Sequence, residues 1–439
     1  MGKKYVITSA QYGAAVNTPF LNSLITYCKA NRAELVVLPM IGISLKDVAL
    51  ASSLSKFELD LNKDHKLNNK IKISGFKVRP NQIIPTTGMG RFAQSDISTV
   101  FASPKQHLQV VPNSNINLPK VLMSTGAVTY PHYWMETRIG VIAQRDHRYG
   151  AIVVDVKTKD KYQYRQISAL RNGRFCDLGK VYSPDNITSE RLEAIVLGDI
   201  HVGDTDPVVM KENLRMIRKY HPKHVILHDI FNGHSISHHH LGDIVTLAEN
   251  YVMHGLSLEN ELKLCAAEIH KVSEATSDGK VILVASNHNE FLDRYLRSGR
   301  FIEEPHNLMI ASKLLTALLE GYDPLEYGIY LVGGVPENVT FLERDQDYKV
   351  KGWQLGSHGD LGANGARRAS PRTKENAYGK SISGHSHSCC IFRDTYIVGT
   401  STYLKLDYNR GPSSWTHTHA LVGSTGKVQL VNIVDGKHT

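Results

Sequence analysis

Short apolar strands alternate with helices through the second half of this 439-residue chain. Runs rich in β-branched residues, with the length of buried strands, occupy residues 194–197, 224–227 and 281–285. Segments with the apolar spacing of helices occupy residues 206–220, 258–277 and 308–319. Because strands that alternate with helices at this spacing pack as layers, the pattern predicts a layered α/β core.

The chain opens with a second, smaller α/β pattern. Residues 5–10 have a strand-like composition, and Thr18-Pro19 provides an N-cap followed by a proline suited to the first helical position. Apolar residues at helical spacing follow, and residues 34–39 then form another short apolar run. We therefore expect a βαβ unit at the N-terminus.

The intervening sequence predicts a β-rich region and a domain boundary. From about residue 71 to residue 181, short β-type runs are broken by proline, glycine and asparagine. Residues 182–188 are rich in turn-forming residues. The expected domains are thus 1–190, a βαβ opening followed by a β-rich region, and 191–439.

Basic residues are concentrated in the first of these domains. The chain has 51 Lys and Arg residues against 42 Asp and Glu, a formal charge of +9. Residues 1–190 hold 25 of the basic and 13 of the acidic residues, a net charge of +12, which leaves −3 for the remainder. This excess favours a polyanionic partner bound largely without sequence specificity, such as DNA, although a solvated basic surface gives the same composition.

Composition excludes several classes of protein. No run approaches the ~18 consecutive apolar residues of a membrane-spanning helix, so no membrane partner is expected. The N-terminus leads directly into a strand, without the apolar region of a secretory signal. The five cysteines lack C-x-x-C spacing and fit neither a disulfide framework nor a zinc knuckle, so a cytoplasmic protein is expected.

Polar motifs follow the predicted strands of the second half. They are, in order, G-D-I-H at 198–201, H-D at 228–229, S-N-H-N-E at 286–290, H-G-D at 358–360 and G-H-S-H at 384–387. Ligand sites of open α/β sheets form beyond the carboxyl ends of strands, where such loops meet. Imidazole, carboxylate and amide groups are donors that suit Mn²⁺, Fe²⁺ or Zn²⁺, so the five motifs together predict a metal site.

This order of motifs resembles that of the calcineurin-like metallophosphoesterases. The resemblance covers roughly residues 191–435, and the D-I-H-V-G form of the first motif is more similar to the Mre11/SbcD nucleases than to protein phosphatases. The whole chain also resembles the early host-DNA-degrading metallophosphoesterases of large tailed phages, which would place it in the bacterial host cytoplasm. The fold that the resemblance implies is a sandwich of two mixed β-sheets flanked by helices, preceded by the basic N-terminal region.

The resemblance also implies which residues hold metal ions. Asp229 would bridge two divalent ions. The first ion would be completed by Asp199, His201 and His387, and the second by Asn287, His358 and His385. His288 would be the catalytic imidazole beside the scissile phosphate, able to protonate the leaving oxygen.

The activity implied is metal-dependent hydrolysis of phosphodiesters, with DNA as the expected substrate. Two cations roughly 3.5–4 Å apart can share a carboxylate, acidify a bridging water and bind phosphate oxygens, so a bridging hydroxide would be the nucleophile. We expect Mn²⁺ as the metal, with Mg²⁺, Fe²⁺ and Zn²⁺ as alternatives.

The chain departs from the family pattern at three positions without losing a ligand. His228 replaces the glycine that usually precedes the bridging Asp, and Ser286 replaces the glycine of the third motif. Asn289 follows the candidate catalytic histidine where the family has an acid, and Glu290 comes one place later. Any role of that acid is therefore in doubt here.

Candidate substrate contacts follow two of the motifs. His234 and His239 come after the bridging Asp, and Arg367 and Arg368 follow the H-G-D motif. Histidine and arginine in loops beside a metal site suit phosphate groups, although solvated loops explain them equally well.

In the first half, basic and aromatic residues at 138–149 and 157–165 could follow a nucleic-acid backbone. A hairpin with alternating polar and aromatic residues would give the same pattern for packing reasons alone.

Two other functions fit the same sequence. A phosphatase acting on nucleotides or phosphoproteins would share the dinuclear site. A catalytically slow protein on the same scaffold would instead bind DNA or a host factor through its basic half. The sequence does not decide whether the expected nuclease cuts within a strand or from its end, or whether the protein is a monomer or a homo-oligomer.

Overall fold

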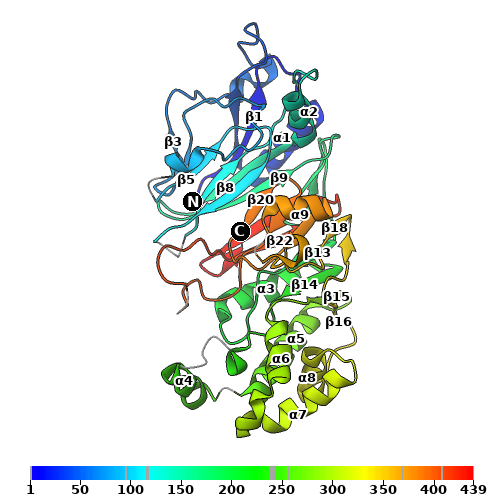
Figure 1. The fold of residues 1–439 in the computed structure, drawn as a ribbon. Coiled ribbons are helices and arrows are strands. Elements are labelled where there is room, and N and C mark those ends of the chain that lie inside the picture. Colours follow the sequence, from blue (N-terminus) through cyan, green and yellow to red (C-terminus); the bar gives the residue numbers. More distant parts are fainter. Residues whose placement is uncertain are drawn as a thin grey trace.

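A computed structural model describes residues 2–93, 96–114, 118–237, 243–255, 257–367, 369–406 and 409–438. In these residues the strands form sheets of seven, ten, four and three strands, and the fold is mixed α/β (Figure 1). None of the helices in these ranges is long and apolar enough to cross a membrane.

The seven-stranded sheet carries the α/β alternation predicted for the second half. Its order is β16-β15-β14-β13-β22-β23-β24, and β13 to β16 are parallel to one another. The strands are β13 (Ala194–Val196), β14 (His224–His228), β15 (Lys280–Val284), β16 (Val339–Phe341), β22 (Thr418–Val422), β23 (Val428–Val434) and β24 (Lys437–His438). Each predicted strand and helix of this half is confirmed to within a few residues.

Helices cover one face of this sheet. They are α3 (Pro207–Tyr220), α5 (Leu258–Thr276), α6 (Asn289–Ser298), α7 (Pro305–Leu319) and α8 (Pro324–Gly333), with α4 (Ile244–His254) at the same end of the molecule (Figure 1). Side chains alternate between the two faces: Ile195 and Val225 lie in a core with the helices, whereas Val196 and Ile226 lie in a core with the ten-stranded sheet. This alternation buries the sheet on both faces.

The ten-stranded sheet joins distant parts of the sequence. Its order is β17-β18-β19-β21-β20-β6-β7-β5-β4-β3. The strands are β3 (His65–Lys66), β4 (Ile71–Ile73), β5 (Ser98–Phe101), β6 (His107–Val111), β7 (Lys120–Ser124), β17 (Lys349–Val350), β18 (Trp353–Gln354), β19 (Ser381–Ser383), β20 (Cys390–Phe392) and β21 (Thr395–Ile397). Because β6 pairs with β20, hydrogen bonding is continuous across the division placed at residue 190.

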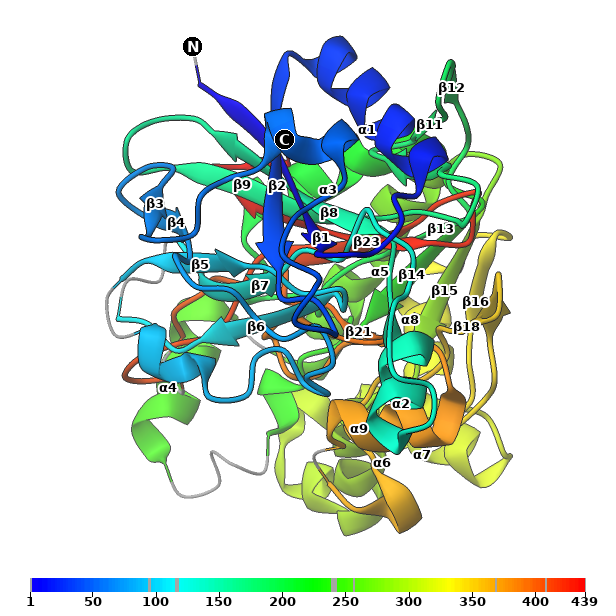
Figure 2. The ribbon, with the colours of Figure 1, turned by 90° about the horizontal axis from the view of Figure 1, so that it is seen from above.

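The N-terminal βαβ unit is confirmed. Parallel strands β1 (Lys4–Gln11) and β2 (Ala33–Met40) flank α1 (Thr18–Asn31). The N-cap is Asn17, whose side chain accepts a hydrogen bond from the Phe20 amide, so the N-cap predicted at Thr18 is wrong by one residue. With β8 (Gly150–Val156) and β9 (Tyr162–Ser168), β1 and β2 form the sheet β2-β1-β8-β9. Side chains of α1 share a core with this sheet, and the helix lies beside its strands in Figure 2.

The remaining elements complete the two halves. They are the small sheet of β10 (Phe175–Asp177), β11 (Lys180–Tyr182) and β12 (Ile187–Ser189), and the helices α2 (Arg138–Asp146) and α9 (Pro371–Tyr378). Helix α2 lies within the region predicted to be β-rich.

The prediction that residues on β9 contact a nucleic acid is wrong for the residues at the centre of the strand. Tyr162 is fully buried, and Tyr164 and Arg165 are 3% and 2% exposed. Basic neighbours are engaged by carboxylates: Arg148 pairs with Asp394, Lys157 with Asp155 and Lys161 with Asp435. The polar and aromatic residues of the β8–β9 hairpin therefore pack inside the protein, which was the alternative interpretation of this segment.

A buried ion pair beside this hairpin links the two halves of the chain. Arg165 on β9 donates to Asp177 from two nitrogens, with Nη2 at 2.7 Å from Oδ2. Asp177 also accepts hydrogen bonds from the Tyr27 hydroxyl at 2.9 Å and from Gln429 Nε2, on β23, at 2.8 Å. Both members of the pair are nearly inaccessible to solvent.

We expect Arg165→Met to lower the free energy of unfolding by about 3–5 kcal/mol, because it leaves the Asp177 charge buried without its partner. Urea denaturation measures this change. The control Lys161→Met breaks an exposed pair with Asp435, 2.6 Å long, and should cost no more than about 1 kcal/mol. Equal costs for the two variants would contradict a structural role for the buried pair.

Candidate metal centre

The polar motifs of the second half converge because of how their strands are arranged. β13, β14 and β15 are parallel neighbours, so their carboxyl ends meet at one edge of the sheet. Asp199 and His201 follow β13, Asp229 directly follows β14, and Asn287 follows β15. The ten-stranded sheet contributes the other residues, since His358 follows β18, and His385 and His387 follow β19.

The ligand atoms of Asp199, His201 and His387 lie close together. His387 Nε2 lies 3.1 Å from Asp199 Oδ2 and 3.1 Å from His201 Nε2. The ligand atoms of these three buried residues all lie within 4.8 Å of one another. They are the three residues expected to complete the first metal site.

Asp229 lies between this set and the second one. Its Oδ2 is 3.5 Å from His201 Nε2 and 3.0 Å from His358 Nε2. Asp199, Asp229 and His358 form another group of ligand atoms within 4.8 Å. The ring of His385 lies 5.2 Å from that of His358, so this histidine is beside the second set. Asp229 therefore has the position that a bridging carboxylate requires.

Several buried oxygen atoms at this point accept no hydrogen bond from the described residues. They include Asp199 Oδ1, Asp229 Oδ1 and Asn287 Oδ1. A buried polar atom left unpaired costs about 1–3 kcal/mol, and more when it is charged. Cations at this cluster would satisfy these oxygens, so the residues present fit a metal site.

The charge states at neutral pH also suit metal binding. Burial lowers the pKa of His201 to about 3 and that of His385 to about 4, so both imidazoles are neutral. Burial would raise the pKa of Asp199, but its hydrogen bond to His387 and the nearby histidines outweigh this effect and lower the pKa to about 2. Neutral imidazole and ionised carboxylate are the ligating forms.

Backbone conformation at the cluster is unusual. His201, Asp229, His385 and His387 have φ angles of 45°, 47°, 76° and 55°, in the left-handed region. This conformation costs of order 1–3 kcal/mol for a residue other than glycine and is concentrated at functional sites. The turns thus hold the ligands at an energetic cost, and the His385 amide donates to Asp199 Oδ2 at 2.8 Å.

Gly384, in the last motif, leaves room for Asp199. A Cβ atom at this position would lie 2.1 Å from Asp199 Oδ1. We expect Gly384→Ala to weaken metal binding by about 10–100-fold, as for other changes that displace a metal ligand without removing it. Titration calorimetry with Mn²⁺ measures the effect. Gly90→Ala, where a Cβ would meet nothing within 4 Å, is the control and should bind as the unmodified protein does.

His288 is positioned as an imidazole beside the ligands. Its Nδ1 donates to the Asn232 carbonyl oxygen at 2.7 Å, which leaves Nε2 as the other ring nitrogen for the site. Its ring lies 4.6 Å from that of His201. His288 Nε2 could also ligate, because a ring nitrogen of His288 groups with ligand atoms of His201 and Asp229 within 4.8 Å.

Ser286 and Asn289, at two of the positions that differ from the metallophosphoesterase pattern, stabilise the loop around His288. The Ser286 hydroxyl accepts a hydrogen bond from the His288 amide at 3.1 Å and donates to Asn289 Oδ1 at 3.0 Å. Glu290 instead lies 3.5 Å from Arg344, which also pairs with Asp360. Ser286 and Asn289 thus stabilise the loop that carries Asn287 and His288.

A cavity of about 450 Å³ opens over the cluster. Ligand residues line it together with two aromatic side chains, Phe291 and Trp415. Their rings lie 4.6 Å from His288 and 4.2 Å from His387 respectively. Sequence reasoning missed both. The position of Phe291, three residues after His288 at the start of α6, was a usable signal, whereas nothing local marks Trp415.

The predicted substrate contacts have different outcomes. His234 lines the cavity, and its Nε2 lies 2.9 Å from Asp204 Oδ2. Arg367 is exposed on the loop after His358 and is not among the residues that line the cavity. His239 and Arg368 lie outside the described residues.

Comparison with known proteins gives one relative. No protein-family model matches the chain, and no solved structure matches it. Protein A1 of Escherichia phage T5 is 26% identical over 466 aligned residues, which cover 99% of this chain and 83% of that protein. This chain is similar to a phage protein. The similarity extends over the basic N-terminal region as well as the region that carries the candidate ligands.

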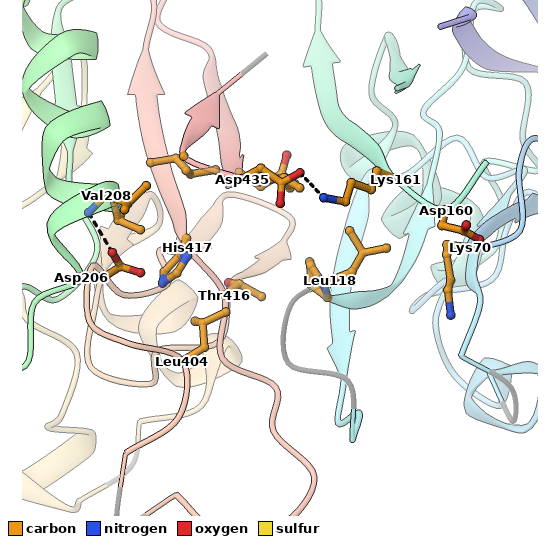
Figure 3. A pocket seen from close by; sticks show the side chains of 16 residues that line it. Lys70, Leu118, Asp160, Lys161, Asp206, Val208, Leu404, Thr416, His417 and Asp435 are labelled. Carbon is orange, nitrogen blue, oxygen red and sulfur yellow. Dashed lines mark hydrogen bonds and ion pairs between the residues drawn. The ribbon is translucent and has the colours of Figure 1, made fainter. Parts of the chain in front are cut away.

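A larger hollow, of about 590 Å³, is lined by residues from both halves of the chain (Figure 3). Lys70, Asp160 and Lys161 line it from the N-terminal half, and Asp206 and Asp435 from the other half. Its two lysines face three carboxylates, and the Lys161–Asp435 pair crosses it. This hollow carries none of the candidate ligands.

Proposed function

We propose that this chain is a metal-dependent phosphodiesterase that hydrolyses DNA in the cytoplasm of a phage-infected bacterium. The scaffold would be a metallophosphoesterase sandwich, with the seven- and ten-stranded mixed sheets as its two layers. The observation that carries the proposal is the convergence of the candidate ligands from both sheets around Asp229, with buried oxygens that lack partners. Similarity to a phage protein supports the setting.

The candidate ligands divide into two overlapping sets. Asp199, His201 and His387 would hold one ion, and Asn287, His358 and His385 the other. Asp229 would be shared. Two divalent ions bound there, Mn²⁺ first among them, would supply an acidified water and positive charge for the phosphate oxygens.

The chain's own contribution to the reaction is orientation and proton transfer. His288 is fixed by its hydrogen bond to the Asn232 carbonyl, so its Nε2 can hold a proton for the leaving oxygen. The attacking water loses one proton to solvent and adds to phosphorus as hydroxide, the bond between phosphorus and the leaving oxygen breaks, and that oxygen takes the proton from His288. A proton from solvent then restores His288. The products are a phosphomonoester and an alcohol.

Aromatic walls favour a nucleic acid over a phosphoprotein. Phe291 and Trp415 stand on the cavity lining, and aromatic side chains beside a phosphate site bind nucleic-acid bases by stacking. A nucleotide phosphatase could stack its base on the same side chains, so these walls argue against a phosphoprotein only. DNA remains the proposed substrate, and the monoester in the assay below tests the nucleotide phosphatase.

The deciding experiment is a nuclease assay of the purified chain. Linear and circular duplex DNA and single-stranded DNA are incubated with Mn²⁺, Mg²⁺ or EDTA, beside nitrophenyl phosphate diester and monoester. We expect cleavage of DNA and of the diester with Mn²⁺ and none with EDTA. Turnover of the monoester with intact DNA would replace the nuclease by a phosphatase. Salt-sensitive DNA retention without turnover would instead support a binding protein.

A further inference from the structure

A second hollow lies next to the cavity over the candidate metal ligands (the metal cavity), and one side chain lines both. Phe291 lines both cavities. The second one has a volume of about 520 Å³ and lies between η3 (His234–Ile236), α6 and η5 (Arg300–Glu303). Its size is within the ~300–1,000 Å³ of sites that bind small molecules.

We infer that this second hollow is a subsite for the nucleoside on the leaving-group side of the scissile phosphate. The inference rests on the proposed phosphodiesterase function and adds to it the place where one substrate nucleoside binds. A substrate strand would pass from the metal cavity over Phe291 into the hollow.

Its lining has the composition that a nucleotide requires. Apolar surface comes from Ile236, Phe291 and Ile302, and the Ile302 side chain is 68% exposed although it is large and apolar. A base covering this surface would remove it from water, and the Phe291 ring offers a stacking face.

Positive charge borders the apolar surface. Arg294 is exposed on α6 at the hollow, and Arg300 is held in place by Glu304 at 2.8 Å and by the Ile236 carbonyl oxygen at 2.9 Å. Guanidinium N–H groups at the edge of a base-sized hollow can donate hydrogen bonds to the carbonyl oxygens of a base held there. One carboxylate, that of Glu303, lies on the same lining.

The position of His288 assigns the hollow to the leaving side. His288 would protonate the leaving oxygen, and its ring lies 4.6 Å from the Phe291 ring. The group attached to the leaving oxygen therefore extends toward Phe291 and the hollow beyond it. The candidate ligand His201 also contacts His288, with 4.6 Å between the two ring centroids.

Two variants of the hollow test the inference without changing a candidate ligand or His288. Arg294→Ala removes the exposed charge, and Ile302→Glu places a negative charge on the apolar surface. The matched control is Arg297→Ala, because Arg297 lies on the same helix, pairs with Asp293 at 2.8 Å and does not line the hollow. Each protein is assayed with Mn²⁺ on the dinucleotide thymidylyl-thymidine and on bis(p-nitrophenyl) phosphate.

The readout is kcat/KM for the dinucleotide divided by kcat/KM for the nitrophenyl diester. We expect this ratio to fall by about tenfold or more in both hollow variants, as loss of a base contact would give, and to stay at the wild-type value in the control. An unchanged ratio in both hollow variants overturns the subsite while the phosphodiesterase stands. If the wild-type protein hydrolyses neither substrate, the proposed function fails instead.

Discussion

Replacing Asp229 by alanine is expected to abolish metal loading and phosphodiester hydrolysis together. Its carboxylate belongs to two of the three groups of ligand atoms that cluster within 4.8 Å. The nearby His358, His288 and His201 outweigh the effect of burial and hold its pKa well below the usual range, so the charge is present at neutral pH. Loss of a shared anionic ligand would weaken both ion sites, and turnover should fall by at least about 10³-fold.

Metal content after Mn²⁺ loading and desalting, measured by inductively coupled plasma mass spectrometry, tests this directly. Asp293→Ala is the control, since Asp293 is a carboxylate on α6 that pairs with the exposed Arg297. Circular dichroism of both variants checks that they fold. Two bound ions and unimpaired turnover in Asp229→Ala would show that this carboxylate is not shared, and the site assignment would be wrong.

The candidate site could be predicted from the sequence because its information is local. Asp199, Asp229 and Asn287 each follow an apolar strand directly or within a few residues, and parallel neighbouring strands bring such positions to one edge. The structure confirms that these residues and the histidines of the last two motifs come together.

Long-range pairing could not be predicted in the same way. The β6–β20 pairing joins residues 107–111 to residues 390–392, and no periodic pattern within either segment specifies its partner. The core beneath the site mixes side chains from both halves, such as Ile152 and Ile391. The domain boundary at residue 190 stays a prediction, since the structure shows one continuous sheet there without showing what folds alone.

The net charge of the first half predicted poorly which basic side chains are available to bind a ligand. The first half carries the basic excess, yet its basic residues near the β8–β9 hairpin pair with carboxylates, and Arg165 is buried with Asp177. Net charge describes the long-range field of a region and says little about which side chain is available. The positive groups near the proposed chemistry, Arg294 and Arg300, come from the half whose formal charge is negative.

The substitution His288→Ala should separate proton transfer from metal binding. If His288 protonates the leaving oxygen, its loss should lower turnover of DNA by about 10²–10⁴-fold while both ions stay bound. Metal content distinguishes this from the alternative in which His288 is a ligand, which its proximity to His201 and Asp229 also permits. Loss of an ion in the variant would make it a ligand.

Leaving-group dependence makes the test more specific. Nitrophenolate is a weak base and leaves without a proton, whereas the alkoxide of a nucleoside needs one, so His288→Ala should impair hydrolysis of bis(p-nitrophenyl) phosphate far less than that of DNA. His270→Ala is the control, because His270 is a partly exposed histidine that contacts the Gly333 carbonyl oxygen at 3.0 Å, outside the cavity lining. Equal losses on both substrates would mean that His288 stabilises charge on the phosphate instead of donating a proton, because only proton donation depends on the basicity of the leaving oxygen.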